Sequence, residues 1–125
     1  MTNPSMHRAA RELLDFIHSS ASPFHVVAES AKRLRRAGFR ELRLDDSWHL
    51  AAGGRYFLSV YGSALFAFAV GKESPVESGA PLRMAAAHTD FPGFRLKPAA
   101  GMTCDGYGTL NIETYGGLIL RTWLD

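Results

Sequence analysis

Cysteine is nearly absent from this sequence of 125 residues, in which Cys104 is the only one. A single thiol excludes a disulfide within the chain, and it also excludes a zinc site built from several thiolates of this chain. A reducing compartment is the simpler assumption for such a sequence. We therefore expect a cytoplasmic protein.

Long apolar runs are also missing from the sequence. Residues 1–10 contain no apolar stretch of signal-peptide length, and no later segment approaches the length that spans a bilayer. We therefore expect no membrane partner.

The sequence carries little excess charge of either sign. Its 14 Lys and Arg residues against 12 Asp and Glu residues leave a formal charge of +2, which is too small to suggest nucleic acid as a partner. The basic residues are nevertheless clustered at Lys32, Arg33, Arg35, Arg36 and Arg40. This basic cluster is either a patch for an anionic ligand or the solvated face of a helix, and we favour the helix face.

What the sequence does contain is the composition of one folded domain, with 46% hydrophobic and 21% charged residues. Apolar residues at helical spacing predict a first helix from about Met6 to Ser19. Ser22 followed by Pro23 supplies an N-cap and a first-turn proline for a second helix. Gly38 fits the end of that helix.

After the helices the apolar pattern changes to a period of two. Residues 55–61 and 64–70 predict a β-hairpin that turns through Gly62 and Ser63. The apolar segment Leu82 to Ala87 predicts a strand buried on both faces, although its pattern also fits a short buried helix. Further strands are expected at Phe94 to Lys97, Thr109 to Thr114 and Leu118 to Trp123. The expected fold class is α/β, with α+β as the alternative, and the two N-terminal helices pack on a mixed β-sheet.

The triplet His88-Thr89-Asp90 directly follows the alanine-rich segment. Ends of strands in α/β sheets are places where ligands and catalytic groups are held on rigid backbone. A neutral imidazole can bind a metal through one nitrogen and donate its other N–H to a carboxylate. By itself the triplet is weak evidence, because a zinc site needs three or four protein ligands and the other histidines show no spacing that would complete a set.

The triplet belongs to a longer series of motifs that runs through most of the chain. These motifs are Ser-Pro-Phe-His at 22–25, Trp48, Gly-Gly-Arg-Tyr at 53–56, Ser-Pro-Val-Glu-Ser-Gly at 74–79, Ala-Ala-His-Thr-Asp-Phe-Pro-Gly-Phe-Arg-Leu-Lys-Pro at 86–98, Glu-Thr-Tyr-Gly-Gly at 113–117 and Thr-Trp-Leu-Asp at 122–125. In this order they resemble the N-terminal portion of the aspartyl-aminopeptidase family of zinc metallopeptidases.

The resemblance implies a metallo-exopeptidase that removes N-terminal, often acidic, residues from peptide substrates. It implies a two-metal site, usually of zinc although other divalent cations are possible, and a homo-oligomer in the full-length form. His88 matches the first metal ligand of the family. Asp90 matches the acid of the family that orients the site. This is the one catalytic role that the resemblance assigns to a residue of this chain. Phe91 departs from the family, since many members have a small residue there, and this puts the substrate preference in question.

The resemblance also implies how the chain divides within a zinc-exopeptidase fold. Residues 1–98 match the N-terminal part of the catalytic domain, and residues 99–125 match the start of an inserted dimerisation domain, which we expect to be truncated within a strand. The other ligands of the family, and its general base, belong to sequence beyond Asp125. We therefore expect the chain alone to lack a full active site. The alternative is a truncated, non-catalytic peptidase that acts as a binding or assembly module.

Other distinctive residues have structural interpretations. His25 is expected to serve the first turn of the second helix, and Tyr115-Gly116-Gly117 a turn that needs positive φ. Trp48 and Trp123 are expected to be packing residues. Glu113 is expected on the solvent side of a strand.

Overall fold

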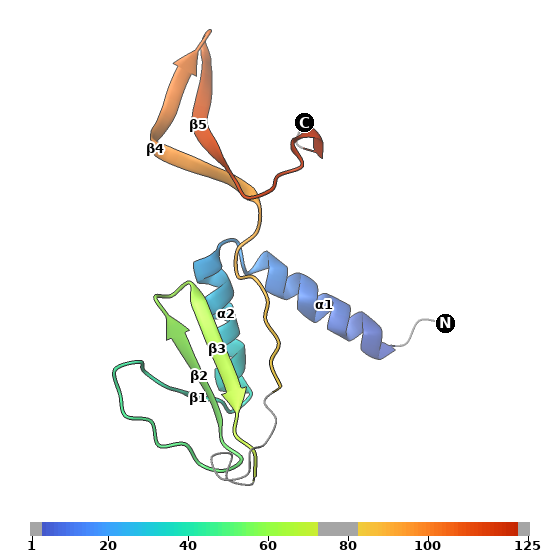
Figure 1. Cartoon of the computed structure of the whole chain (residues 1–125). Helices are drawn as coiled ribbons and strands as arrows, with labels where there is room; N and C mark the ends of the chain where they lie inside the picture. The colour runs from blue at the N-terminus through green and yellow to red at the C-terminus, as the bar shows by residue number, and fades with distance from the viewer. Residues whose placement is uncertain (1–3, 73–82, 123–125) are drawn as a thin grey trace. The chain divides into compact units, whose positions relative to one another are not determined.

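The computed structural model describes residues 4–72 and 83–122 (Figure 1). The chain forms two compact units, residues 1–89 and residues 90–125, and each is described by itself. The first unit holds the helices and a three-stranded sheet, whereas the second holds a two-stranded hairpin.

Both predicted helices are confirmed. Helix α1 spans Pro4–His18 and helix α2 spans Pro23–Arg36. The hydroxyl of Ser22 accepts a hydrogen bond from the backbone N–H of His25 at 3.4 Å, as expected of an N-cap. At the other end of α2, Gly38 has a φ of +79° and the N–H of Phe39 reaches back to the carbonyl of Leu34 at 3.0 Å. This is a Schellman ending, which needs a left-handed residue after the helix.

The sheet of the first unit has the order β1-β2-β3. Strand β1 (Arg40–Glu41) runs parallel to β2 (Arg55–Val60), and β3 (Ala64–Ala69) runs antiparallel to β2. The predicted hairpin is confirmed, and its turn places Tyr61 and Gly62 at φ values of 51° and 70°. The sheet is therefore mixed, and with α2 it confirms the expected α/β class.

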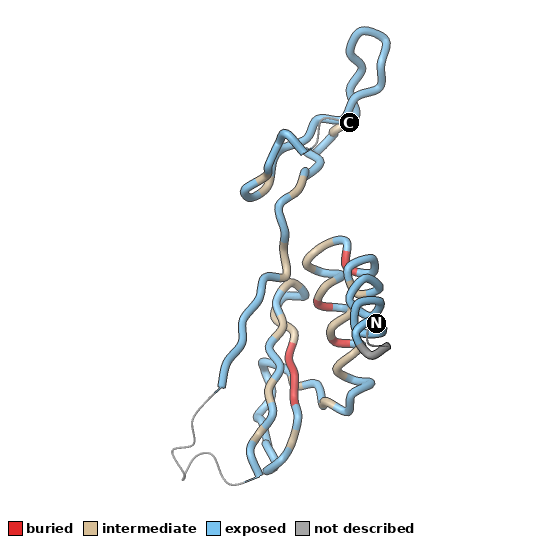
Figure 2. Tube along the Cα trace, turned by 90° about the vertical axis from the view of Figure 1, so that its right-hand side faces the viewer, coloured by how far each residue is buried: buried red, intermediate tan, exposed pale blue. Residues whose placement is uncertain are grey.

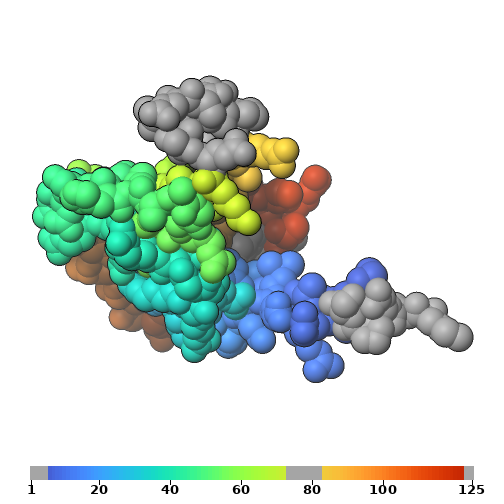
Figure 3. Space-filling model, turned by 90° about the horizontal axis from the view of Figure 1, so that it is seen from below, coloured from blue at the N-terminus to red at the C-terminus, as the bar shows by residue number. Residues whose placement is uncertain are grey.

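The core of the first unit lies between α2 and the sheet. Figure 2 shows buried residues, in red, in α2 and in β2. Val27 and Ala31 are buried on α2, and Tyr56, Phe57 and Leu58 on β2. Phe57 is 0% exposed, so it is the centre of this core. Figure 3 shows that the atoms of α2 and of residues 40–70 form one continuous packed body.

Helix α1 contributes less to this core than its apolar pattern predicts. Leu13, Leu14 and Ile17 are all exposed in the described part of the chain. Its contacts with α2 include Arg33, whose guanidinium donates to the carbonyl of Glu12 and lies 4.9 Å from the ring centroid of Phe16. The described residues therefore leave the apolar face of α1 uncovered.

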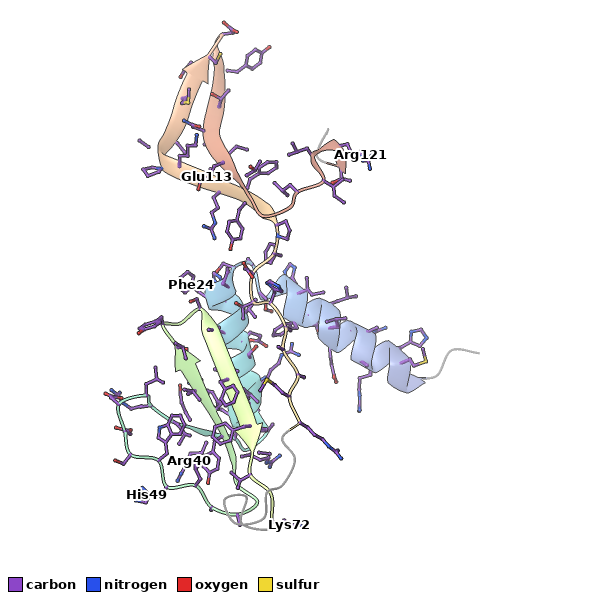
Figure 4. All side chains as sticks on the ribbon, in the orientation of Figure 1. Phe24, Arg40, His49, Lys72, Glu113 and Arg121 are labelled. Carbon is purple, nitrogen blue, oxygen red and sulfur yellow. The ribbon has the colours of Figure 1, made fainter. Side chains whose placement is uncertain are left out.

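The basic cluster is largely paired within the first unit. Lys32 and Arg33 form ion pairs with Glu29 at 3.2 and 3.0 Å, and Arg35 forms one with Glu41 at 2.6 Å. Arg40 donates to the backbone carbonyl of His49 at 2.8 Å (both labelled in Figure 4). These partners support a charged helix face rather than a patch for an anionic ligand.

The second unit is a long antiparallel hairpin of β4 (Gly93–Cys104) and β5 (Tyr107–Tyr115). It confirms the strands expected at Phe94 to Lys97 and at Thr109 to Thr114. The register shifts between Leu96 and Gly101, where Ala99 has a φ of +53°.

The strand expected at Leu118 to Trp123 is wrong for its described residues. Leu120–Thr122 form a short 3-10 helix, and Trp123 lies outside the described residues. The N–H and the hydroxyl of Thr122 both bond to the carbonyl of Ile119, at 3.0 and 2.7 Å. These local bonds use groups that a strand would offer to a neighbouring strand.

Among the described residues, no helix is both long and apolar enough to cross a membrane.

Candidate functional site

The segment that leads to His88 is extended and exposed, not a buried strand. Residues 83–88 carry no strand assignment and all are exposed, so the expectation of a strand or a buried helix at Leu82 to Ala87 is wrong for its described residues. Leu82 itself lies outside them. An extended segment becomes a strand only when a neighbour accepts its backbone hydrogen bonds, and no strand of the described residues pairs with this one. His88 is exposed at the end of this segment.

One side chain fastens the end of this segment to the first unit. The hydroxyl of Thr89 donates to the backbone carbonyl of Ser63 at 2.9 Å, directly before strand β3. The boundary between the two compact units falls immediately after Thr89. His88 is therefore carried by the first unit and Asp90 by the second.

Asp90 is half-buried and bonds to a residue 25 positions later in the chain. The hydroxyl of Tyr115 donates to Oδ2 of Asp90 at 2.6 Å, a length typical of a hydroxyl bonded to an ionised carboxylate. This bond, with the negative charge of Asp90, raises the pKa of Tyr115 above its ordinary value. Asp90 is therefore held from the end of β5.

Arg95 lies against the same tyrosine. Its guanidinium carbon is 3.5 Å from the ring centroid of Tyr115, which is a cation–π contact. Arg95 is also the cross-strand partner of Glu113, so a positive and a negative side chain stand opposite each other on β4 and β5. Glu113 is exposed on the hairpin, as expected (Figure 4).

The turn after β5 closes onto the residues that follow Asp90. Gly116 has a φ of +71°, which confirms the expected turn, and a Cβ atom added there would lie 3.4 Å from the Cα atom of Pro92. Phe91, between Asp90 and Pro92, is 54% exposed. The close approach of Gly116 and Pro92 brings Tyr115 within reach of Asp90.

Comparison with known proteins decides the family. Residues 16–125 match the profile of the family described as aminopeptidase I zinc metalloprotease (M18). The chain belongs to the M18 aminopeptidase family.

The curated M18 relatives are much longer than this chain. It is 43% identical over 113 residues to the probable M18 family aminopeptidase 2 of Pseudomonas paraeruginosa, which covers 90% of this chain and 26% of the relative. The corresponding protein of Azotobacter vinelandii is 41% identical over the same share of each chain. The chain therefore spans about a quarter of the length of these relatives.

Solved structures of M18 aminopeptidases share the fold. The chain matches mApe1 of Chaetomium thermophilum with a TM-score of 0.83 and 37% identity, over 92% of this chain and 26% of the other. It matches the mApe1 dodecamer of S. cerevisiae with a TM-score of 0.72 and 29% identity, over 94% of this chain and 27% of the other. The expected zinc-exopeptidase fold is confirmed as part of an M18 aminopeptidase domain.

The described residues of this M18 chain do not make up a metal site by themselves. Within residues 4–72 and 83–122, no three side chains of His, Cys, Asp or Glu gather in a way that could hold a metal ion. His25, for example, has its Nδ1 atom 2.7 Å from the hydroxyl of Ser22, which confirms its role in the first turn of α2. The donor set that these described residues offer a zinc ion falls short of the three or four protein ligands that such sites use.

Tyr115 is the residue of this region that sequence reasoning missed. It was interpreted only as part of a turn, because nothing in a local pattern relates it to an acid 25 residues earlier. The sequence Glu-Thr-Tyr-Gly-Gly at 113–117 gives no physical hint of the hydrogen-bond partner of the tyrosine. The contact becomes visible only once the hairpin register is known.

Proposed function

We propose that this chain is the N-terminal part of a zinc-dependent metallo-aminopeptidase that removes N-terminal, mainly acidic, residues from peptides. The observation that carries this proposal is the family match over residues 16–125, which contains the whole motif around His88. In this proposal His88 is one metal ligand and Asp90 orients the site. Zinc is the expected metal, and other divalent cations are possible.

Within this proposal the chain alone is inactive. Its described residues offer one ligand where a zinc site requires at least three, and a lone imidazole lacks the charge and denticity to hold zinc tightly. Residues 1–98 belong to the catalytic domain and residues 99–125 begin the inserted dimerisation domain.

A chimera tests the proposed activity. Residues 1–125 replace the matching 113-residue region of the Pseudomonas paraeruginosa relative, so that the relative supplies the other three quarters of its length. We expect the chimera to hydrolyse aspartyl and glutamyl peptides with a dependence on zinc, and the His88→Ala variant to be inactive. His49→Ala is the matched control, because His49 lies in the loop after β1 and has no proposed role.

Two results would contradict this proposal. One is a folded chimera, verified by circular dichroism and size exclusion, that cleaves no N-terminal residue with zinc present. The other is turnover by the isolated chain, with its intact mass verified, that needs zinc and is lost in His88→Ala. The second result would place a complete site within these 125 residues.

A second candidate function is assembly with other subunits, and specific observations favour it. The hairpin exposes Leu96 and Leu110 at 64% and 63%, and one solved relative is a dodecamer. Exposed apolar side chains beside unpaired strand edges favour association between chains. We propose a cytoplasmic homo-oligomer in the full-length form, with peptides as substrates and with neither nucleic acid nor membrane as partner.

Light scattering after size exclusion separates the two candidates. An assembly module associates with itself or with the relative's subunits at micromolar concentration, and Leu110→Glu weakens that association. Leu14→Glu is the control for an exposed leucine on α1, outside the hairpin. A chain that stays monomeric alone and with the relative's subunits excludes the assembly function.

A further inference from the structure

The bond between Tyr115 and Asp90 joins the end of β5 to the residue two positions after His88. Of the residues of β5, all of which are described, only Tyr115 is half-buried, and the others are exposed. The residues of β5 are therefore exposed to solvent along most of the strand, and the half-buried position is the one that contacts Asp90.

Tyr115 is restrained through its ring and through the residue that follows it. Arg95 covers its face at 3.5 Å, and the backbone of Gly116, in its left-handed conformation, lies against Pro92. Arg95 is the cross-strand partner of Glu113, two positions before Tyr115 on β5, so the register places Arg95 on the same face of the hairpin as the tyrosine. A ring fixed in this way directs its hydroxyl at Asp90 without the large entropy loss that a mobile side chain would incur.

We infer that Tyr115 is a positioning residue for Asp90, which fixes the direction of the carboxylate through the phenolic hydrogen bond. This inference rests on the proposed function, in which Asp90 orients the metal site. A carboxylate can accept several hydrogen bonds, so Asp90 can accept the bond from Tyr115 and still orient the metal site. Outer groups that hydrogen-bond a site residue typically change metal affinity or activity by about 10- to 100-fold when removed.

The hydrogen bond between Tyr115 and Asp90 therefore belongs both to the hairpin and to the proposed site. Asp90 precedes β4, and Tyr115 ends β5, so the hydrogen bond closes the base of the hairpin across 25 residues of chain. Any change that separates β4 from β5 at this base removes the hydrogen bond from Tyr115 to the carboxylate. Phenylalanine at position 115 would keep the ring and its arginine contact but would lose the donor.

The direct test is the side-chain rotamer of Asp90 in the 125-residue chain, measured by NMR couplings that report χ1. We expect a single rotamer in the wild type and averaging over rotamers in Tyr115→Phe. Tyr107→Phe is the matched control, because Tyr107 is in the same strand, 75% exposed, and has no part in this cluster. A single Asp90 rotamer that persists in Tyr115→Phe overturns the inference.

A second measurement follows the contact from the other partner. Tyrosine absorbance at alkaline pH should contain a late ionisation that is lost in Tyr115→Phe and kept in Tyr107→Phe. Asp90→Asn should move that late ionisation back towards the ordinary range. No change in Asp90→Asn overturns the inference. Neither measurement needs zinc or peptide, so an inactive chimera with an intact Tyr115 signal would contradict only the proposed function.

Discussion

The two units of this chain are stabilised in different ways. In the first, α2 covers a mixed sheet and Phe57 is completely buried between them. In the second, no described residue is buried, and the hairpin is held by its backbone ladder and by the cluster of Asp90, Arg95 and Tyr115. Burial of apolar side chains is the dominant stabilising term of folding, so the first unit should carry most of the chain's stability. The second should depend on a few polar contacts.

The largest effect is expected from emptying the core of the first unit. Phe57→Ala should lower the free energy of unfolding by about 3–5 kcal/mol, because it removes a large buried side chain and leaves a cavity. Urea denaturation followed by circular dichroism measures this loss. Phe66→Ala, on the neighbouring strand and 53% exposed, is the control, with a much smaller loss.

The same variant probes whether the units are independent. Amide exchange in β4 and β5 should be unchanged in Phe57→Ala if the hairpin does not rely on the core. Loss of hairpin protection in that variant would show that the two units unfold together and would remove the contrast between them.

A smaller effect is expected at the end of α2. Gly38→Ala forces a residue with a Cβ atom into a left-handed conformation at φ +79°, which should cost about 1–2 kcal/mol. The new Cβ atom would meet only the flexible end of Arg55, at 3.3 Å, so the backbone conformation accounts for most of the loss. Gly101→Ala in β4 is the control, because Gly101 is not among the glycines with positive φ and nothing lies within 4 Å of its added Cβ atom. Equal losses at the two glycines would contradict this explanation.

Acid should weaken the first unit through Glu29. The hydrogen bond from Arg33, followed by that from Lys32, lowers the pKa of Glu29. A depressed carboxyl pKa contributes stability above the unfolded pKa, and this contribution is lost as the pH falls through the folded value. Stability measured from pH 7 to pH 2 should therefore decline less steeply in Glu29→Gln than in the wild type. If stability declined with falling pH equally in both proteins, Glu29 would make no such contribution.

Alkali should weaken the second unit, with the smallest effect. Because the hydrogen bond to Asp90 raises the pKa of Tyr115, its contribution is complete below the unfolded pKa of about 10 and is lost as the pH rises through the folded value. Hairpin protection in amide exchange should fall at high pH in the wild type and vary less in Tyr115→Phe. The same alkaline loss in both proteins would contradict the assignment.

The contrast between the units also explains what the sequence could predict. Ser22, Gly38 and the alternation of residues 55–70 act locally, so both helices and the first hairpin could be recognised from them. Residues 83–87 have the apolar composition of a buried strand, but a strand depends on a partner, and none of the described residues supplies one. The contact of Asp90 with Tyr115 depends on the register of β4 and β5, which alternation alone does not determine.

The candidate site follows the same rule. His88 and Asp90 could be selected as candidates because they lie together in an ordered series of motifs, whereas the spacing of the other histidines in the sequence indicated no partners for them. The position of Tyr115 against Asp90, and of Arg95 against Tyr115, emerged only from the three-dimensional arrangement.

The central proposal, that His88 is one ligand of a zinc site to which the described residues supply too few ligands, is tested most directly by zinc content. The chimera with the Pseudomonas paraeruginosa relative is purified, dialysed against zinc-free buffer and analysed by atomic emission, beside its His88→Ala and His49→Ala variants. We predict that the parent and His49→Ala retain zinc, that His88→Ala loses it, and that the isolated 125-residue chain retains none. Equal zinc retention by His88→Ala and His49→Ala would contradict the claim.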